Sequence, residues 1–351
     1  MKLILLSFLS VFFLFILFLA WAGYPWSLRE KKLSPEIIHI EPKEMFDEDT
    51  DPSVIKILTW NLGFLYGKGS EGPGYITRDN EYFQSRLDQL VEEIKKWDPD
   101  VICFQEIDFD SSRSQKINQA RYVAEKAGYP YVAEAISWDA NYIPFPYWPI
   151  TNNFGGMKSG GAILSRYPLK GHEVTLLDKP ASHPWWYNVF YLHRYFQKVT
   201  LEVGTKTFSL VNLHLEAFDK KDREKQINEL IALSQKEKID FIAGDFNMVP
   251  TSAMNKSKFE EGDDNYENDP SFELMTKSGM LEVIPEEIYA QMESHYFTFP
   301  SWRPDRRLDY IFYQAGHKMM KAEILPSALS DHLPLRTSFQ IDSPKVNPYS
   351  L

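Results

Sequence analysis

The sequence is poor in cysteine and has no excess of basic residues. Its single cysteine, Cys103, rules out an intrachain disulfide, and the surrounding Asp-Val-Ile-Cys-Phe-Gln predicts a buried strand position. Lys and Arg total 38 against 49 Asp and Glu, so the net charge is −11. This balance disfavours broad, sequence-independent attraction to nucleic acid, although it leaves room for a local basic groove.

Two common cofactor and metal signatures are also missing. A doubly wound dinucleotide-binding fold would place a Gly-x-Gly-x-x-Gly turn directly after its first strand, where this chain has Asn61-Leu62-Gly63-Phe64. There is no His-Glu-x-x-His and no set of cysteine ligands, which disfavours zinc. What is present is a globular composition, 44% apolar and 25% charged, in 351 residues that suffice for one large or two smaller domains.

The amino terminus contains a long apolar run. After Lys2, residues 3–22 carry no charge, which matches the ~20 residues that a membrane-spanning helix needs. Ala20-Trp21-Ala22 also offers a small-x-small signal-peptidase site. We expect residues 1–26 to be a signal anchor or a signal peptide. The protein would then be membrane-anchored or secreted, with its folded part outside the cytoplasm.

The rest of the chain divides by composition. Residues 27–52 are polar and acidic and contain three prolines, which is typical of a linker. Residues 53–342 are expected to form one folded domain, and residues 343–351 a tail. Apolar periodicity predicts helices at 81–97, 113–127 and 219–236, and strands at 55–61, 100–105, 131–136, 160–165, 196–203, 206–214, 239–245, 307–313, 320–324 and 335–341.

These elements indicate an α/β (α+β) fold. Strands outnumber helices, and they occur both beside helices and in adjacent pairs, with no clear periodicity between residues 137 and 158. Such a mixture fits two packed, mainly antiparallel β-sheets flanked by helices on their outer faces.

Residues 239–250 are the most informative segment. A short apolar strand runs into Gly244-Asp245-Phe246-Asn247, and open α/β sheets gather their ligands at such carboxyl ends. By strand alternation, Asp245 and Asn247 point the same way. A carboxylate can accept a proton or hold a cation, and a carboxamide can donate to an anionic oxygen, which suits phosphate chemistry. Taken alone, the four residues fit a strand followed by an Asx turn equally well.

Other apolar strands also end in groups that can act on phosphate. Each has an ordinary explanation by itself, because Asn and Asp form caps and turns, His is often a hydrogen-bonded interior imidazole and Glu often lies on a solvated rim. Their recurrence at strand ends favours a shared site. The candidates are Asn61, Glu106, Asn212, His214, Asp309, Asp331 and His332.

In this order, the motifs resemble those of the endonuclease/exonuclease/phosphatase superfamily, which has the deoxyribonuclease-I-like fold. The resemblance runs from about Val54 to Ile341 and implies a four-layer α/β sandwich. The motifs are Thr59-Trp60-Asn61-Leu62, Phe104-Gln105-Glu106, Gly161-Ala162-Ile163-Leu164-Ser165-Arg166, Asn212-Leu213-His214-Leu215, Gly244-Asp245-Phe246-Asn247, Arg307-Leu308-Asp309-Tyr310 and Ser330-Asp331-His332-Leu333-Pro334.

The resemblance implies a divalent-metal-dependent phosphoesterase that hydrolyses a phosphodiester by in-line attack of water. Asp245 would orient or deprotonate the water, and Asn247 would hold a phosphate oxygen. His332 would contact the scissile phosphate and would be oriented by Asp309. His214 would be a second imidazole facing the phosphate.

The implied metal is Mg²⁺, with Mn²⁺ as the alternative. Glu106 would be the main ligand, with Asn61 and Asp331 close to the cation. A hard cation on carboxylate and carboxamide oxygens offsets the negative charge that makes a phosphodiester resist water. Mg²⁺ keeps several of its waters, which matches one dedicated Glu better than a full protein cage.

The motifs do not identify the substrate, so its class has to be predicted from other parts of the sequence. Residues 138–149 and 185–196 are crowded with Trp, Tyr and Phe. Such rings suit a membrane interface or base stacking, and ordinary packing between loops is the simplest reading. The acidic charge and the apolar amino terminus favour a lipid-linked phosphodiester of sphingomyelinase-like or phosphoinositide-like type.

Two alternatives remain. The first is an exported or membrane-anchored nuclease, because nucleic acid is a partner that the charge disfavours without excluding. The second is a non-catalytic binding module of the same fold, which the presence of Glu106, Asp245 and His332 argues against. The expected partners are a phosphoester substrate and a membrane, and no segment indicates an obligate protein partner.

Overall fold

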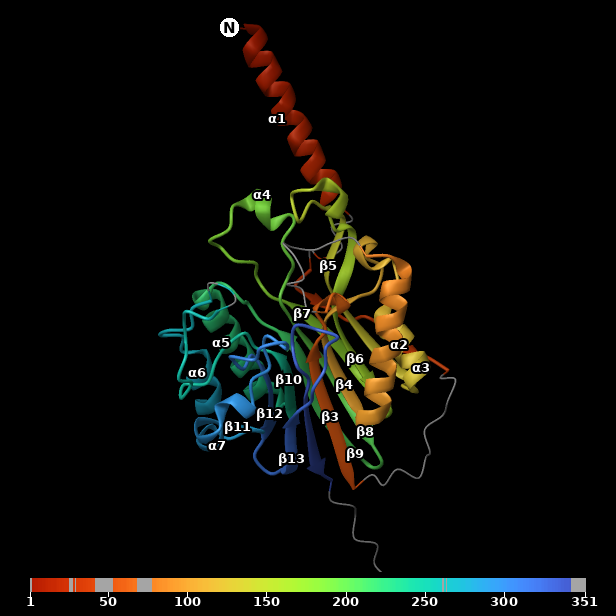
Figure 1. The fold of residues 1–351 in the computed structure, drawn as a ribbon, viewed down its shortest axis with the longest axis vertical. Coiled ribbons are helices and arrows are strands. Elements are labelled where there is room, and N and C mark those ends of the chain that lie inside the picture. The colour runs from red at the N-terminus through yellow and green to blue at the C-terminus, as the bar shows by residue number, and fades with distance from the viewer. Residues whose placement is uncertain are drawn as a thin grey trace, which may run out of the picture.

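Residues 2–24, 28, 30–41, 53–67, 78–260, 262 and 264–341 are described by the structure, a computed structural model of the chain. They form two seven-stranded sheets that pack face to face, with helices against the outer faces (Figure 1). Within these residues each sheet is mainly antiparallel and contains a parallel pair, β9 with β10 in one and β3 with β4 in the other. The expected sandwich of two packed sheets flanked by helices is confirmed.

The first sheet, called sheet A, has the strand order β1-β7-β8-β9-β10-β12-β11. Its strands are β1 Lys32–Leu33, β7 Leu169–Leu176, β8 Tyr195–Val203, β9 Lys206–His214, β10 Phe241–Asp245, β11 Met280–Glu282 and β12 Asp309–Gln314.

The second sheet, called sheet B, has the order β13-β14-β3-β4-β6-β5-β2. Its strands are β2 Ile37–His39, β3 Val54–Asn61, β4 Val101–Asp108, β5 Tyr131–Ile143, β6 Gly155–Ser165, β13 Lys318–Ile324 and β14 Leu335–Gln340.

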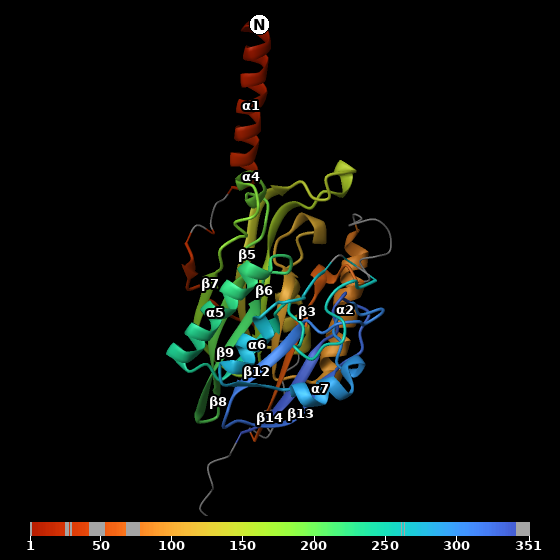
Figure 2. The same ribbon diagram turned by 90° about the vertical axis from the view of Figure 1, so that its left-hand side faces the viewer.

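Helices cover the outer face of each sheet (Figure 1, Figure 2). Helices α2 (Asn80–Trp97) and α3 (Gln119–Ala127) pack on sheet B, and α5 (Lys220–Glu237) and α6 (Ser271–Lys277) pack on sheet A. The shorter elements are α4 Trp185–Asn188, α7 Glu286–Gln291 and the 3-10 turns η2 Gly63–Leu65, η3 Ser112–Ser114, η4 Ile150–Asn152 and η5 Glu293–His295.

Strand β3 shows why the central strands read as continuous apolar runs. Ile57 points into the core between the sheets, where it joins Val199 and Ile311. Its neighbour Leu58 points the other way and joins Leu87 of α2. Because both faces of the strand are buried, successive residues are apolar even though they belong to different cores.

The helix expected at 113–127 is shorter than predicted. Residues 112–114 form only a 3-10 turn, and Gln115 and Lys116 have φ values of 58° and 60°, which no α-helix accommodates. The helix begins after Asn118, whose side chain caps it by accepting from the backbone N–H of Arg121 at 2.9 Å.

Part of the segment 27–52, expected to be a linker, is integrated into the sheets. Residues 32–33 pair with β7 and residues 37–39 pair with β5, so this segment adds an edge strand to each sheet. Residues 42–52 and the expected tail at 343–351 lie outside the described residues.

The stretch at 137–158 is also more regular than its sequence indicates. β5 continues to Ile143, and β6 begins at Gly155. Their pairing shifts register between Ile136 and Trp138 and again between Ala140 and Ile143. Each shift breaks the two-residue alternation by which a strand is recognised in sequence.

The apolar amino terminus forms one long helix, α1 (Lys2–Ala22), which projects away from the sandwich (Figure 1). Residues 4–22 have a mean hydropathy of 2.7, and 6% of this window is buried in the protein. By length and composition α1 could cross a membrane, and a signal sequence would meet the same test.

Candidate active site

Three neighbouring strands of sheet A bring polar side chains into one row. β9 and β10 are parallel, and β10 and β12 are antiparallel, so His214 and Asp309 both lie opposite Asp245. Three motifs that are far apart in the sequence therefore meet at one edge of the sheet.

Sheet B faces this row with Asn61 and Glu106. β3 and β4 are parallel, and Asn61 pairs with Gln105, the residue before Glu106. The pairing of β4 with β6 is interrupted between Phe104 and Ile107, and Glu106 has a φ of 48°. A bulge of this kind re-aims a side chain, and strained backbone of this kind is common at functional sites.

Asn61 joins the groups from the two sheets. Its Nδ2 donates to Asp245 Oδ2 at 2.9 Å and lies 3.3 Å from Glu106 Oε1. Its Oδ1 accepts from the backbone N–H of Gly63 at 3.0 Å, which fixes the orientation of the carboxamide. Two carboxylates from different sheets thus share one donor.

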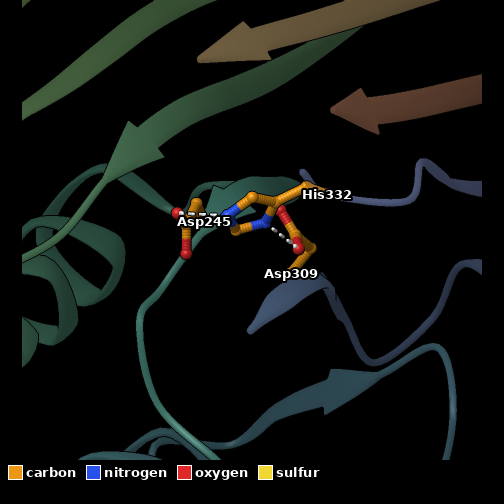
Figure 3. A group of neighbouring side chains, drawn as sticks. All are labelled: Asp245, Asp309 and His332. Atoms are coloured by element: carbon orange, nitrogen blue, oxygen red, sulfur yellow. Dashed lines mark hydrogen bonds and ion pairs between the residues drawn. The ribbon is translucent and has the colours of Figure 1, made fainter. Parts of the chain in front are cut away.

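Asp309, His332 and Asp245 form a carboxylate–imidazole–carboxylate chain (Figure 3). His332 Nδ1 lies 2.8 Å from Asp309 Oδ2, and its Nε2 lies 3.9 Å from Asp245 Oδ2. Burial disfavours the charged imidazole, but the two carboxylates outweigh it and raise the pKa of His332 to about 10. Burial raises the pKa of Asp245 to about 7, and the charge of His332 opposes that rise.

Arg194 is a residue of this site that sequence analysis missed. It precedes β8, whose first residue Tyr195 pairs with His214. Its Nη1 makes a very short contact with Nε2 of His214, in which the guanidinium donates. Behind it, Arg194 Nε lies 3.5 Å from Oε2 of Glu216, a buried carboxylate that also accepts from the Tyr191 hydroxyl at 2.9 Å. The hairpin register is the only sequence signal that could have indicated this group.

His214 is therefore neutral. Burial, and after it the charge of Arg194, hold the pKa of His214 well below its usual value. Nε2 of His214 lies 3.5 Å from Asp245 Oδ2 and 3.7 Å from Glu106 Oε1. Because this nitrogen accepts a hydrogen bond from Arg194, it carries no proton. His214 therefore lies close to the two carboxylates without forming an ion pair with either.

The direction of Asn247 is set by a turn and not by strand alternation. β10 ends at Asp245, and Asn247 has a φ of 50°. Its backbone N–H donates to Asp245 Oδ1 at 3.0 Å, and its Nδ2 donates to the carbonyl of Leu215 at 3.0 Å. The segment is thus an Asx turn and also part of the site, so the two interpretations of its sequence do not exclude each other.

Glu106 and Asp331 fit a divalent cation. The Glu106 side chain is 25% exposed, and burial together with the negative charge of Asp331 raises its pKa. A cation next to the two carboxylates would offset their repulsion. The Asn61 carboxamide lies beside them, with its Nδ2 toward Glu106 and its Oδ1 accepting from the Gly63 N–H. Carboxylate oxygens suit a hard ion of the Mg²⁺ type.

Asp245, Asp309 and His332 also offer three potential ligand atoms within 4.8 Å of one another. In this group, however, Asp309 already occupies Nδ1 of His332, and a protonated imidazole does not bind metal. This group therefore fits a cation less well than the carboxylates of Glu106 and Asp331 do.

All the predicted residues except Asn212 lie in or directly behind one pocket of about 310 Å³. Asn212 is fully buried between the sheets, where its Oδ1 accepts from Gln105 Nε2 at 2.7 Å. Asn61 and Asp309 contact the lining residues from behind. Much of the remaining wall is aromatic and comes from residues 138–154 and 187–191, and Phe218, Asp264 and Phe299 are among the other lining residues. The predicted residues that line the pocket are Glu106, His214, Asp245, Asn247, Asp331 and His332.

A sequence model described as "Endonuclease/Exonuclease/phosphatase family" matches residues 58–332. No curated protein matches the chain. Among solved structures, an endonuclease/exonuclease/phosphatase from Beutenbergia cavernae is 18% identical, with a TM-score of 0.59, over 83% of this chain and 72% of that one.

Two other solved structures are similar in fold. The mannosyl-6-phosphatase of Bacteroides thetaiotaomicron is 16% identical, with a TM-score of 0.53, over 82% of this chain and 100% of that one. Humanized TDP2 of D. rerio is 16% identical, with a TM-score of 0.52, over 82% of this chain and 100% of that one. At these identities the likeness establishes the fold and not the substrate.

Proposed function

Because the chain belongs to the endonuclease/exonuclease/phosphatase family, we propose that it is a divalent-metal-dependent phosphoesterase that cleaves a phosphodiester by in-line attack of water. The observation that carries this proposal is that Asn61 and Glu106 from sheet B meet Asp245, Asp309 and His332 around one pocket.

The residues divide into a metal side and a proton-transfer side. Glu106 and Asp331 would hold Mg²⁺, or Mn²⁺ in its place, with Asn61 close to the cation. When bound, the cation supplies positive charge to the phosphate oxygens and the leaving oxygen. This side lies next to Asp245, which receives a hydrogen bond from Asn61 at 2.9 Å.

On the other side, Asp245 orients the attacking water and accepts its proton. Its pKa of about 7 suits a general base near neutral pH. His332, which Asp309 and Asp245 keep protonated, donates from Nε2 to a phosphate oxygen and neutralises the charge that grows there. Asn247 would add a neutral donor, since its Nδ2 has a second hydrogen beyond the one given to Leu215.

His214 lines the pocket, and we infer that it faces the phosphate as a neutral imidazole. Because it is neutral and accepts from Arg194, the positive charge next to it belongs to the guanidinium. Arg194 lines the pocket and is buried, so it is the second cation available to a phosphate.

We assign the substrate to the phosphodiesters of membrane lipids. The aromatic wall of the pocket offers an apolar environment beside the phosphate-binding groups, and the net charge of −11 disfavours a long polyanion. The apolar helix α1 would keep the enzyme at a membrane, where such substrates lie.

Hydrolysis of bis-p-nitrophenyl phosphate tests the reaction class. We expect turnover with Mg²⁺ or Mn²⁺, its loss with EDTA, and a fall of about 10²-fold or more in Glu106→Ala and Asp245→Asn. Asp240→Asn, a change in the carboxylate at the opposite end of β10, is the matched control. A well-folded wild-type protein without turnover on diester or monoester substrates under varied metals would leave only the binding-module alternative.

The substrate class needs a comparison on one preparation. Sphingomyelin and phosphoinositide vesicles, plasmid DNA and p-nitrophenyl phosphate should be assayed side by side at equal metal concentration. Preferred cleavage of lipid supports our assignment, preferred nicking of DNA identifies a nuclease, and preferred hydrolysis of p-nitrophenyl phosphate identifies a monoesterase.

A further inference from the structure

Helix α1 ends against the aromatic wall of the pocket. The Trp21 ring stacks on Tyr142 of β5 with centroids 6.0 Å apart, and the Phe18 ring lies 6.2 Å from Phe190, which lines the pocket. The Asn141 backbone N–H donates to the carbonyl of Tyr24 at 2.7 Å. The end of α1 is thus attached to the sandwich by rings and by backbone hydrogen bonding.

The same contacts support the loop at residues 144–153. The Tyr142 hydroxyl donates to Asn153 Oδ1 at 2.6 Å, and Asn153 Nδ2 donates to the carbonyl of Pro144 at 3.1 Å. This closes the loop on itself and points its tip away from the core. At the tip, Trp148 is 80% exposed and Ile150 is 64% exposed.

Helix α4 presents a second exposed aromatic tip. Trp185 is 63% exposed and Trp186 is 40% exposed. In both views α4 and the yellow-green segment around residue 150 lie at the end of the molecule from which α1 emerges (Figure 1, Figure 2). We call the loop at 144–153 together with α4 the rim.

Ordinary packing explains the inner rings but not the tips. Trp138, for example, donates from Nε1 to the Phe190 carbonyl at 2.9 Å and lies beside Phe154. Trp148 and Trp185 are mostly exposed and are absent from the pocket lining. Moreover, residues 140–157 and 180–193 contain no Asp, Glu, Lys or Arg, although 25% of the chain is charged.

We propose that the rim inserts its tips into the headgroup region of the bilayer that holds α1, so that the pocket faces the lipid surface. Trp and Tyr are favoured at this depth because their rings are apolar and their N–H or O–H groups reach water. An uncharged rim avoids the cost of burying charge there. That the pocket then draws its substrate from the same surface rests on the proposed function.

Site-directed spin labelling of the full chain in phosphatidylcholine vesicles tests this orientation. Because the native Cys103 is fully buried, a nitroxide can be placed by Trp148→Cys or Trp185→Cys, with Met254→Cys as the exposed control outside the rim. At 148 and 185 we expect greater collision with oxygen, which dissolves in lipid, than with a water-soluble nickel chelate. At 254 we expect the reverse.

Labels at 148 and 185 that are as water-accessible as the label at 254 would overturn the proposal. Labels shielded from both reagents would indicate contact with another protein and would overturn it too. The measurement requires no turnover, so its failure is distinct from failure of the proposed function.

The effect on catalysis is measured separately with Trp148→Ser/Trp185→Ser. Neither residue lines the pocket, so we expect unchanged hydrolysis of soluble bis-p-nitrophenyl phosphate. With vesicle-borne substrate, we expect turnover to fall about tenfold because the pocket loses its alignment with the surface. Equal loss on both substrates would mean that the rim serves the fold alone, and no loss on either would mean that it does not orient the enzyme.

Discussion

At the scale of single residues, Asp309 both orients the His332 ring and, together with Asp245, keeps it protonated. Asp309 is fully buried and lies 2.8 Å from Nδ1 of His332. It orients the ring and makes Nε2 the nitrogen that faces Asp245 and the pocket. The same kind of pair recurs at the other end of β10, where Asp240 lies 2.9 Å from Nε2 of His317.

This recurrence provides a controlled prediction. Asp309→Asn keeps an oxygen that can accept from Nδ1 but removes the negative charge behind the ring, so we expect kcat to fall about 10²-fold. Asp240→Asn makes the same change to an Asp–His pair away from the pocket and should leave kcat unchanged. Steady-state kinetics on a soluble diester, with far-UV circular dichroism to verify folding, measure both. Similar losses in the two variants would contradict a role in the reaction.

Sequence analysis identified those site residues that lie in recognisable local motifs. Asp245 follows an apolar strand and His332 follows an acid just before the last strand, so both can be recognised locally. Arg194 cannot, because it lies in an aromatic segment without periodicity and reaches the site only through the β8–β9 register. The neutral state of His214 follows from its burial and from the charge of Arg194, and the sequence indicates neither of these.

At the scale of elements, His172 fastens the segment between β1 and β2. Its Nδ1 lies 3.1 Å from the carbonyl of Pro35, and its Nε2 lies 3.1 Å from Nε2 of Gln197. The neutral ring with a proton on Nδ1 satisfies both partners, because it donates to the carbonyl and accepts from the amide. A second proton would face the Gln197 donor. Burial accordingly lowers the pKa of His172 to about 4.

Stability should therefore fall in mild acid. The pKa of His172 is about 4 in the folded chain and about 6.5 in the unfolded chain, so the unfolded chain binds more protons between these values. The contribution of the neutral His172 ring to the free energy of unfolding is complete above pH 6.5. It is lost as the pH drops toward 4, and the free energy of unfolding then falls by up to about 1.4 kcal/mol per pH unit.

Urea unfolding between pH 7 and pH 4.5 measures this slope. His172→Gln should be less stable than wild type at pH 7 and should show a shallower loss in acid. His39→Gln, a change in an exposed histidine of β2, should reproduce the wild-type slope. An unchanged slope in His172→Gln would assign the acid sensitivity to other groups.

Helices and strands were predicted correctly where a single apolar periodicity extends along the whole element. α2 has a regular apolar face and an Asp79 cap, and the structure extends the expected helix by only one residue. β1 and β2 are too short to show alternation, and the shifted pairing of β5 with β6 conceals it. α3 begins late because of two left-handed residues that helix periodicity does not reveal.

At the scale of the whole molecule, Glu106 and Asp331 carry a repulsion that metal would relieve. The charge of Asp331 contributes to the raised pKa of Glu106. We expect Mg²⁺ to stabilise the fold by about 2.7 kcal/mol at a hundredfold excess over its Kd, and EDTA to reverse this. In Glu106→Gln the repulsion is absent, so the metal-free protein should be at least as stable as wild type and should lose the response to metal.

Thermal unfolding with and without Mg²⁺ provides the measurement. Glu93→Gln is the control, because burial also raises the pKa of Glu93 but its carboxylate bonds to Ser327 outside the pocket. If Mg²⁺ stabilised Glu106→Gln as much as it stabilises wild type, the cation would have to bind at a site without Glu106.

Neither sheet contains the whole candidate site. Asp245 and Asp309, the proposed proton-transfer groups, come from sheet A, whereas Asn61 and Glu106 on the proposed metal side come from sheet B. The Asn61–Asp245 hydrogen bond therefore exists only when the two sheets are packed together. Deeper in the interface, Gln105 Nε2 donates to Asn212 Oδ1 at 2.7 Å across the same boundary. A refolding chain that has formed both sheets but has not yet joined them would have native far-UV ellipticity and no catalytic centre. Enzymatic activity would then be the last signal to return, and it would report directly on the closing of the two halves.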